Sequence, residues 1–389
     1  MKNKMKKTQI VLLAVAVAAV ACAITVFVVC QGNYEEMKGW QRAVYMVCKG
    51  EEIRNTKYVG KLSTDTWSPE NEYRLEDTAI LMKDPDKDFV VMNVTDLHHA
   101  EYDYTYLNNV RANRDLYYIK LKAKELKPDL ITLSGDIFCE DGGSNIYSVH
   151  RLTEYLDSLG IPWAPVFDYH DWMGNCDLNY IADIMMESEY CLLKKGDPDL
   201  GIANYVINIC EERDGKTEVV HSVLMMDTHH GNVYDSQIEW YKWATTGVNE
   251  VSGTRVPSSV IMHVPVAQYA YAYDAAWDAE NNCWREGYDA FGVKGEDVCC
   301  EMKDGKPLDN GLFAAMKEIG TTTNVLCGHD HVNSFSVLYE GIRLTYSLRI
   351  GRGGYWDDTY ETDTFGVTTL TINSAGDGEI EHHYIHPEI

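Results

Sequence analysis

The chain has 389 residues, of which 45% are hydrophobic and 24% charged, so it can form one large domain or two smaller ones and is neither disordered nor fibrous. Its formal net charge of −26 argues against nucleic acid or an anionic membrane surface as a partner, because both require a basic footprint. The 11 cysteines include no Cys-x-x-Cys pair, so a zinc knuckle or a redox motif is unsupported.

The first 31 residues differ from the rest of the chain. Four lysines precede an apolar run from Ile10 to Cys30 that only Thr25 interrupts. At ~1.5 Å per residue this run covers roughly one hydrocarbon thickness, which is long for the core of a cleaved signal peptide. Residues 1–31 are therefore predicted to be a cytoplasmic basic tip and a signal anchor, with a cleaved signal peptide or a buried helix as alternatives. The charge pattern predicts a single-pass cell-membrane protein with an extracytoplasmic body, or a secreted protein if the segment is cleaved.

Residues 32–85 are predicted to be a lead-in segment that packs on the main domain, with a short helix around Met37 to Val47. From residue 86 to 389 helical and strand patterns alternate. The stretch "DFVVMNVTDLHH" predicts a strand with a polar end, and "LYYIKLKAKELKPDLITLSGDIF" predicts an amphipathic helix followed by a buried strand. This order repeats in "VHRLTEYLDSLGIPWAPVFDYHD". The pattern predicts an α/β fold with helices outside a parallel or mixed sheet.

Five of the predicted strands end in aspartate or histidine. Any one of these residues alone is more typical of a cap, a turn or a satisfied core group. Together they favour one site, because the ends of successive strands meet at one edge of an open α/β sheet. The residues are Asp96, His98, Asp136, His170, Asp171, His263, His329 and His331.

Imidazole and carboxylate are the ligands that borderline and hard cations prefer. An Asp-x-His or His-x-His spacing places alternate side chains on one side of an extended segment. A shared carboxylate such as Asp136 could bridge two ions ~3.5–4 Å apart, the arrangement that supports phosphoryl displacement.

In order along the chain, "TDLHH", "SGDIF", "DYHD", "IMHVP" and "GHDH" resemble the motifs of the calcineurin-like metallophosphoesterases. Stretches such as "QIEWYKW" and "GHDHVNSF" are similar to the branch of plant and fungal purple-acid-phosphatase-like proteins. The resemblance implies a two-sheet mixed β-sandwich flanked by helices. It also implies two divalent or trivalent metal ions (Fe, Mn or Zn) and hydrolysis of phosphate monoesters or diesters.

The resemblance also implies roles for the motif residues. The first ion would be held by Asp96, His98 and His331, and the second by His263 and His329. Asp136 would bridge the two ions.

The fourth motif departs from the family pattern. The family has Gly-Asn-His-Asp or Gly-Asn-His-Glu there, with the asparagine as a ligand of the second ion, whereas this chain has Asp168 and Tyr169 before His170 and Asp171. A weak or altered second site ranks first among the explanations, Tyr169 as an anionic ligand ranks second, and Asp168 ranks third. Cys139 stands where purple acid phosphatases carry an iron-binding tyrosine, so no tyrosinate is expected from that position.

In the implied mechanism, the cations would activate a water molecule that attacks phosphorus. His170 would protonate the leaving oxygen or stabilise the transition state, and Asp171 would orient His170. A purely structural rim position is the alternative for His170. Arg349 and Arg352 would contact the substrate phosphate or, equally, pair with the acidic body.

The predicted function is therefore a metal-dependent phosphoesterase acting on a small phosphorylated substrate, with membrane contact through the N-terminal helix alone. The first alternative is a catalytically impaired protein of the same fold that binds a partner, since the expected asparagine is absent. The second is a phosphodiesterase or pyrophosphatase acting on nucleotides or lipids.

Overall fold

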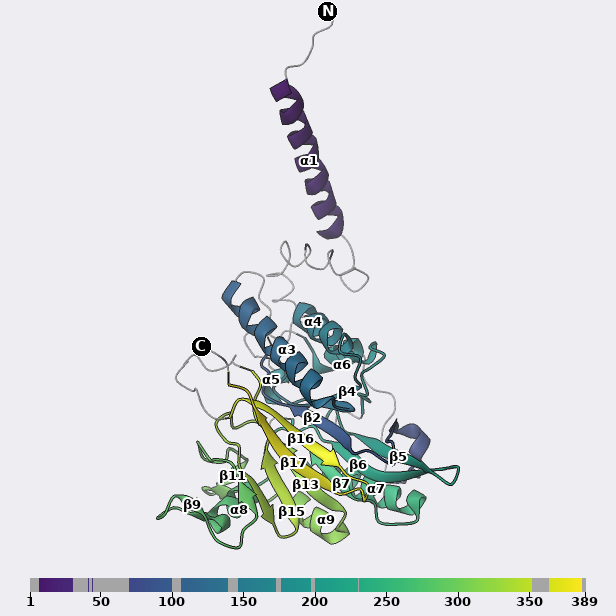
Figure 1. The fold of residues 1–389 in the computed structure, drawn as a ribbon, viewed down its shortest axis with the longest axis vertical. Helices are drawn as coiled ribbons and strands as arrows, with labels where there is room; N and C mark the ends of the chain where they lie inside the picture. The colour runs from purple at the N-terminus through teal and green to yellow at the C-terminus, as the bar shows by residue number, and fades with distance from the viewer. Residues whose placement is uncertain are drawn as a thin grey trace, which may run out of the picture.

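The computed structural model describes residues 7–30, 41, 44, 70–99, 106–138, 146–172, 176–196, 200–229, 231–351 and 364–386. Most of the helix predicted near Met37 lies outside the described residues, as do Cys139 and Arg352. Two main sheets form the body of the molecule, with helices around them (Figure 1).

The smaller sheet has five strands in the order β17-β16-β2-β3-β4. β2, β3 and β4 are parallel, β16 pairs antiparallel with β2, and β17 pairs antiparallel with β16. The strands are β2 (Phe89–Val94), β3 (Leu130–Ser134), β4 (Trp163–Val166), β16 (Gly366–Ile372) and β17 (Gly378–Tyr384).

The larger sheet has eight strands in the order β1-β5-β6-β7-β13-β15-β14-β10. β6, β7, β13 and β15 are parallel neighbours at its centre. The strands are β1 (Ala79–Met82), β5 (Tyr205–Arg213), β6 (Lys216–Met225), β7 (Ser258–Ile261), β10 (Ala290–Phe291), β13 (Thr322–Cys327), β14 (Ser336–Tyr339) and β15 (Ile342–Tyr346).

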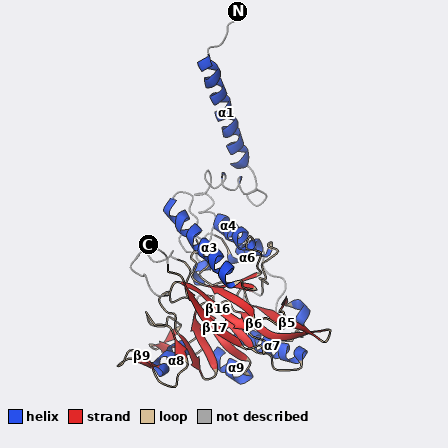
Figure 2. Ribbon diagram, viewed as in Figure 1, coloured by secondary structure: helices blue, strands red, loops and turns tan. Residues whose placement is uncertain are grey.

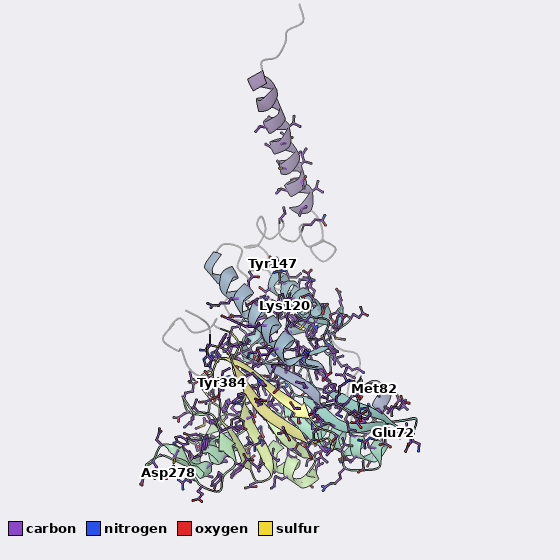
Figure 3. The ribbon with its side chains drawn as sticks, viewed as in Figure 1. Glu72, Met82, Lys120, Tyr147, Asp278 and Tyr384 are labelled. Carbon is purple, nitrogen blue, oxygen red and sulfur yellow. The ribbon has the colours of Figure 1, made fainter. Side chains whose placement is uncertain are left out.

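β1 comes from the predicted lead-in segment, where it follows a short 3₁₀ helix, η2 (Leu75–Asp77), and pairs with β5 at one edge of the larger sheet. Two small hairpins lie outside the main sheets. They are β8 (Trp277–Asp278) with β9 (Cys283–Trp284), and β11 (Met302–Lys303) with β12 (Lys306–Pro307). Figure 3 shows Met82 of β1 and Asp278 of β8 at opposite sides of the body.

Helices cover the outer faces of both sheets (Figure 2). The smaller sheet packs against α3 (Tyr106–Leu126), α4 (Ile146–Asp157) and α6 (Leu178–Met186). The larger sheet packs against α7 (Asp235–Ser252), α8 (Gln268–Ala276) and α9 (Leu312–Ile319).

Strand alternation sorts apolar side chains between two cores. In β13, Leu326 belongs to the core between the sheets, which also holds Val91 of β2 and Ile207 of β5. Val325 points the other way, into the core beneath α7, α8 and α9. Because both faces are covered, β3 is buried throughout, as its unbroken apolar pattern predicts. The predicted mixed α/β fold with two main sheets is confirmed.

The N-terminal segment forms helix α1 (Lys7–Cys30), most of which extends away from the body in Figure 1. In the part of the chain that the structure describes, no helix is both long enough and apolar enough to cross a bilayer. The predicted signal anchor, and with it the membrane contact, therefore has no structural support.

Candidate metal centre

Ends of strands from both sheets meet at one place. β2, β3 and β4 of the smaller sheet lead into Asp96, Asp136 and Asp168, and β7 and β13 of the larger sheet lead into His263 and His329. Hydrogen bonds from backbone N–H groups join these exits: Gly328 N donates to the carbonyl oxygen of His263 over 3.0 Å, and His329 N donates to the side-chain Oδ1 of Asp96 over 3.1 Å. The loops of the two sheets are thus fixed to each other where their polar side chains collect.

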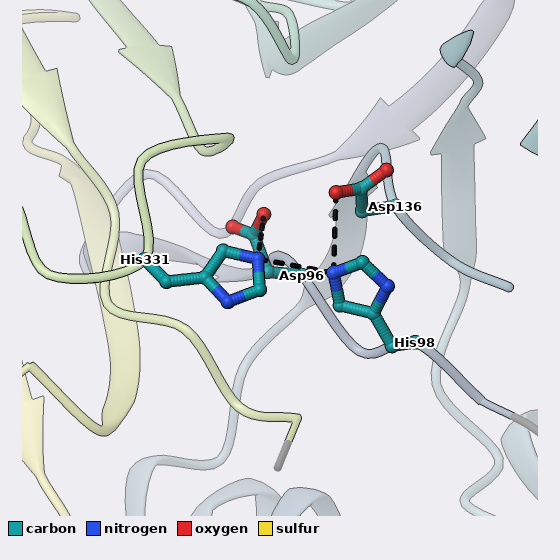
Figure 4. A group of neighbouring side chains, drawn as sticks. All are labelled: Asp96, His98, Asp136 and His331. Atoms are coloured by element: carbon teal, nitrogen blue, oxygen red, sulfur yellow. Dashed lines mark hydrogen bonds and ion pairs between the residues drawn. The ribbon is translucent and has the colours of Figure 1, made fainter. Parts of the chain in front are cut away.

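The first group of ligand atoms belongs to Asp96, His98, Asp136 and His331, all buried and all within 4.8 Å of one another (Figure 4). The Nε2 atoms of His98 and His331 face each other at 3.0 Å. His98 Nε2 lies 3.2 Å from Asp136 Oδ2, and His331 Nε2 lies 3.3 Å from Asp96 Oδ1. Two imidazole nitrogens and two carboxylates that converge in this way match the donor set of a cation site.

The second group belongs to Asp136, Asp168, His263 and His329, whose ligand atoms also lie within 4.8 Å of one another. His263 Nε2 is 3.4 Å from Asp136 Oδ2 and 3.2 Å from Asp168 Oδ2. Asp136 belongs to both groups, so the two candidate sites share one carboxylate. A buried Asp/His cluster of this shape can hold a pair of metal ions.

The orientation of His263 suits a ligand. Its Nδ1 is 2.7 Å from the carbonyl oxygen of Ser134, which fixes Nδ1–H as the donor and directs Nε2 at the carboxylates. A Cβ on Gly135 would overlap the His263 ring, and Gly135 has φ +83°, so this position requires glycine. The "SGD" sequence therefore lets the imidazole pack directly on the loop that carries Asp136.

Four candidate ligands have a left-handed backbone, which is uncommon for residues other than glycine. The φ angles are 51° at Asp96, 45° at His98, 46° at Asp136 and 78° at His329. Strained backbone of this kind collects at functional sites, where the surrounding structure holds it in place. Here hydrogen bonds hold it: His98 N donates to Asp136 O over 2.8 Å, and Gly351 N donates to Asp96 O over 3.0 Å.

Charge interactions keep two of the carboxylates ionised. Burial alone would raise the pKa of Asp96, but the charge of His331, its hydrogen bond and the charge of His263 together outweigh burial and lower this pKa to about 2. Burial likewise opposes ionisation of Asp136, yet His263 and His98 lower its pKa well below the usual range. Both side chains therefore carry the negative charge that a cation requires.

The second group holds a proton when no cation is bound. Burial, together with the charge of Asp136, raises the pKa of Asp168 to about 7. Burial opposes protonation of His263, but the charges of Asp168 and Asp136 raise its pKa well above the ordinary value. Burial and the charge of His263 lower the pKa of His329 to about 4. His263 therefore takes up a proton more readily than His329 does.

Unsatisfied polar atoms support this interpretation. Among the described residues, Asp136 Oδ1, Asp168 Oδ2, His263 Nε2 and His329 Nδ1 are buried and have no hydrogen-bond partner. Leaving a buried polar atom unpaired costs roughly 1–3 kcal/mol, so several in one cluster require a ligand to satisfy them. The residues present therefore fit the two metal ions that the sequence predicts.

The fourth motif is placed differently from its predicted ranking. Asp168, ranked third, is fully buried at the end of β4 and joins the second group. Tyr169 is 43% exposed at the start of the short helix α5 (Tyr169–Trp172). Because the chain turns into a helix after Asp168, successive side chains diverge by about 100° and only one of the two can face the cluster. The burial of Asp168 and the exposure of Tyr169 therefore favour Asp168 as the candidate ligand from this motif.

His170 and Asp171 occupy distinct places in α5. The half-buried ring of His170 lies 5.7 Å, centroid to centroid, from the ring of His98, at the margin of the first group. Asp171 is fully buried, and its two oxygens accept from the backbone N–H groups of Phe138 at 2.8 Å and Asp168 at 3.3 Å. Asp171 thus links the loop after β3 to the loop after β4. The sequence predicts a different role for it, the orientation of His170.

Arg349 is buried beside the first group, where its Nη1 donates to the carbonyl oxygen of Gly351 over 3.1 Å. Gly351 N in turn donates to Asp96 O. The described contacts of Arg349 therefore support the loop behind Asp96, while Arg352, its predicted companion, lies outside the described residues.

Sequence reasoning gave little weight to one further strand end. β6 leads into Asp227, Thr228 and His229. Thr228 bonds to the residues next to Asp168 and His263: its N–H donates to Phe167 O over 3.4 Å, and its Oγ1 accepts from Val264 N over 3.3 Å. His229 has φ 48°, like His98. The repeated Asp-x-His spacing, found at both Asp96 and Asp227, is the signal that could have placed this loop at the site.

Comparisons with known proteins find relatives that are named as phosphatases. No family model matches it. It is 24% identical over 312 residues to a probable inactive purple acid phosphatase, number 14, of Arabidopsis thaliana, covering 69% of this chain and 71% of the relative. It is also 24% identical over 328 residues to a probable inactive purple acid phosphatase, number 29, of the same plant, covering 75% and 79%. The phosphatase DCR2 of Saccharomyces cerevisiae is 24% identical over 246 residues, which cover 59% of this chain and 40% of that protein.

Solved structures show a looser likeness. A dimetal phosphatase from Danio rerio aligns with a TM-score of 0.47 at 10% identity, covering 73% of this chain and 93% of the other. A purple acid phosphatase from yellow lupin seeds aligns with a TM-score of 0.42 at 13% identity, covering 76% and 53%. The sequence relatives are the informative ones, and they confirm the resemblance to purple-acid-phosphatase-like proteins that the five motifs predict.

Proposed function

We propose that the chain is a metal-dependent phosphoesterase that hydrolyses phosphate monoesters or diesters of small molecules. The observation that supports this most directly is the pair of buried Asp/His groups joined through Asp136. Asp96, His98, Asp136 and His331 would hold one Fe, Mn or Zn ion, and Asp136, Asp168, His263 and His329 would hold the other. When bound, such a pair supplies an activated water molecule and neutralises charge on the phosphoryl oxygens.

The chain's own residues would do the rest. His263, oriented by the Ser134 carbonyl, and His329, held through its N–H by Asp96, keep the donor atoms pointed at one place. Pre-organised ligands of this kind avoid reorganisation during the reaction. His170, beside His98 and partly open to solvent, is placed to give a proton to the leaving oxygen.

Two variants test the proposal by removing one ligand from each group. We expect the purified chain to bind two metal ions and to hydrolyse an activated phosphate monoester. His329→Ala should lose the second ion, and His331→Ala should lose the first. Loss of a residue that only supports a metal ligand typically lowers activity ~10–100-fold, so each of these variants should lower kcat/KM by more than that. Glu381→Ala, an exposed change on β17, serves as the control. One tightly bound ion and no turnover with Mn, Fe or Zn would overturn the enzyme proposal.

A catalytically impaired binding protein is the second candidate. Two observations favour it. Two relatives are named as probable inactive phosphatases, and Tyr169 stands where the family motif has an asparagine, while the second group contains Asp168 from the preceding position. Under this alternative the chain would bind phosphorylated molecules without turnover. Equilibrium binding of a phosphate monoester that stays intact over hours would identify it, and the profile of hydrolysed substrates would separate monoesterase from diesterase or pyrophosphatase activity.

A further inference from the structure

A third group of potential ligands lies at the margin of the second metal group. The side chains of Cys299, His329 and Asp330 each offer a ligand atom, and these atoms lie within 4.8 Å of one another. Cys299 is exposed, His329 is partly buried and Asp330 is buried, so the group opens toward solvent on the side of the thiol. His329 is common to this group and to the second metal group.

The segment that carries Cys299 is fastened to the loop after β13. Gly295 N and Glu296 N both donate to Asn333 Oδ1, over 2.9 and 3.1 Å, and Cys299 N donates to Asp330 Oδ2 over 3.0 Å. A Cβ on Gly295 would approach the carbonyl oxygen of Val332 to 2.5 Å, so the two segments touch backbone to backbone. The thiol is therefore held next to His329 by the same loop that supplies His329.

Asp330 is also held in a fixed orientation. Its Oδ2 accepts from the Tyr346 hydroxyl and, over 3.4 Å, from Asn333 Nδ2, in addition to Cys299 N. A carboxylate oriented by several donors is a pre-organised ligand. On the neighbouring side chain, His329 Nδ1 is buried and has no hydrogen-bond partner among the described residues.

We propose that Cys299, His329 and Asp330 form a third cation site, selective for soft divalent ions such as Cd²⁺ and excess Zn²⁺, and that a cation bound there inhibits the protein by drawing His329 away from the second metal. Thiolate selects softer ions over Mn²⁺ or Mg²⁺, which prefer oxygen ligands. In the binding step the Cys299 S–H bond breaks, its proton passes to solvent, and a sulfur–metal bond forms without any change of oxidation state. The inhibition rests on the proposed phosphoesterase function, whereas binding of the soft cation does not.

The adjacent residue provides a matched control. Cys300 is half-buried, sits next to Cys299 and has no place in the three-residue group. The full chain, loaded with Mn²⁺, is titrated with Cd²⁺ while the ultraviolet cadmium–thiolate charge-transfer band is recorded. This band reports sulfur ligation alone, so Cd²⁺ exchange at the Asp/His groups does not contribute to it.

We expect the tightest phase of the band to disappear in Cys299→Ser and to persist in Cys300→Ser. The Cd²⁺ concentration that halves each variant's own basal activity should rise at least about tenfold in Cys299→Ser, as expected when a ligand is lost, and stay unchanged in Cys300→Ser. Equal bands in the two variants would overturn the site. A band that is lost as expected, with no effect on inhibition, would overturn the regulatory role alone, and absence of activity in every form would count against the proposed function while leaving the band to decide the site.

Discussion

The two metal groups are built from the same kinds of residue, but only the first matches the family motifs at every position. The first has two carboxylates and two imidazoles, from Asp96, Asp136, His98 and His331. The second has the same composition because Asp168, one residue before the position of the motif's asparagine, supplies a carboxylate instead of a neutral amide. Across both groups three aspartates face the cations instead of two, which lowers the net charge of a loaded centre by one unit.

This difference bears on which ions the second group prefers. An added carboxylate strengthens the attraction for a highly charged or hard cation, but it also reduces the positive charge that remains to polarise a phosphoryl group. The first group should therefore bind its ion as the family motif would. The second group should hold its ion tightly but polarise the phosphoryl group of the substrate less. The variants below separate these effects.

The largest effect is expected where the groups overlap. Asp136→Asn removes the shared negative charge, so both ions should bind at least about a hundredfold more weakly and hydrolysis should fall by a similar factor or more. Metal content after dialysis and kcat/KM measure the two effects. A variant that kept one ion at full occupancy would show that the groups are independent of each other.

Removal of the Asp171 carboxylate should loosen the second group more than the first. Asp171→Ala leaves the buried N–H groups of Phe138 and Asp168 without acceptors, at roughly 1–3 kcal/mol each in unfolding free energy. We expect weaker binding of the second ion as the Asp168 loop shifts, with a lower kcat and little change in the pH profile of the reaction. Asp171→Asn, which keeps one acceptor oxygen, should restore part of both. A changed pH profile would instead mark Asp171 as a partner of His170.

Asp168→Asn replaces the carboxylate of Asp168 with a neutral amide and so tests the extra charge directly. With metal bound, we expect about a tenfold decrease or less in the affinity of the second ion, together with an unchanged or higher kcat. An activity loss as large as that of Asp136→Asn would show that the second group depends on the charge of Asp168.

Without metal, the same variant should show a pH-dependent gain in stability. The pKa of Asp168 is raised to about 7 by burial and by Asp136, so the stability that its protonated form contributes is complete below pH ~4 and is lost as the pH rises through 7. Asparagine does not ionise. The metal-free variant should therefore unfold at a higher temperature than the parent at pH 8, and the difference should shrink toward pH 5.

The smallest effect is expected at Tyr169. Because its side chain is substantially exposed, Tyr169→Phe should change metal content and kcat/KM by less than about twofold. A visible charge-transfer band in the iron-loaded parent that disappears in this variant would reinstate Tyr169 as a ligand.

The sequence was most informative where strand periodicity and residue type acted together. Apolar strands that end in Asp-x-His or His-x-His predict both the sheet edge and the candidate ligands, and the structure brings Asp96, His98, Asp136, His263, His329 and His331 together there. Asp168 was underrated because its direction depends on where β4 ends and α5 begins, and a boundary cannot be read from sequence to one residue. The task of Asp171 depends on backbone N–H groups of a distant loop, for which side-chain patterns give no signal.

The left-handed backbone at the candidate ligands limits how the protein can be engineered. Glycine would adopt the φ angles of Asp96, His98, Asp136 and His329 without strain, so each substitution could relieve on the order of 1 kcal/mol in the metal-free chain. A selection for thermal stability alone would therefore favour glycine at the very positions that are proposed to hold the metals. Libraries built for stability should keep these four codons constant or should be screened with metal present. Bound metal would stabilise the fold through these side chains, whose backbone is strained when metal is absent.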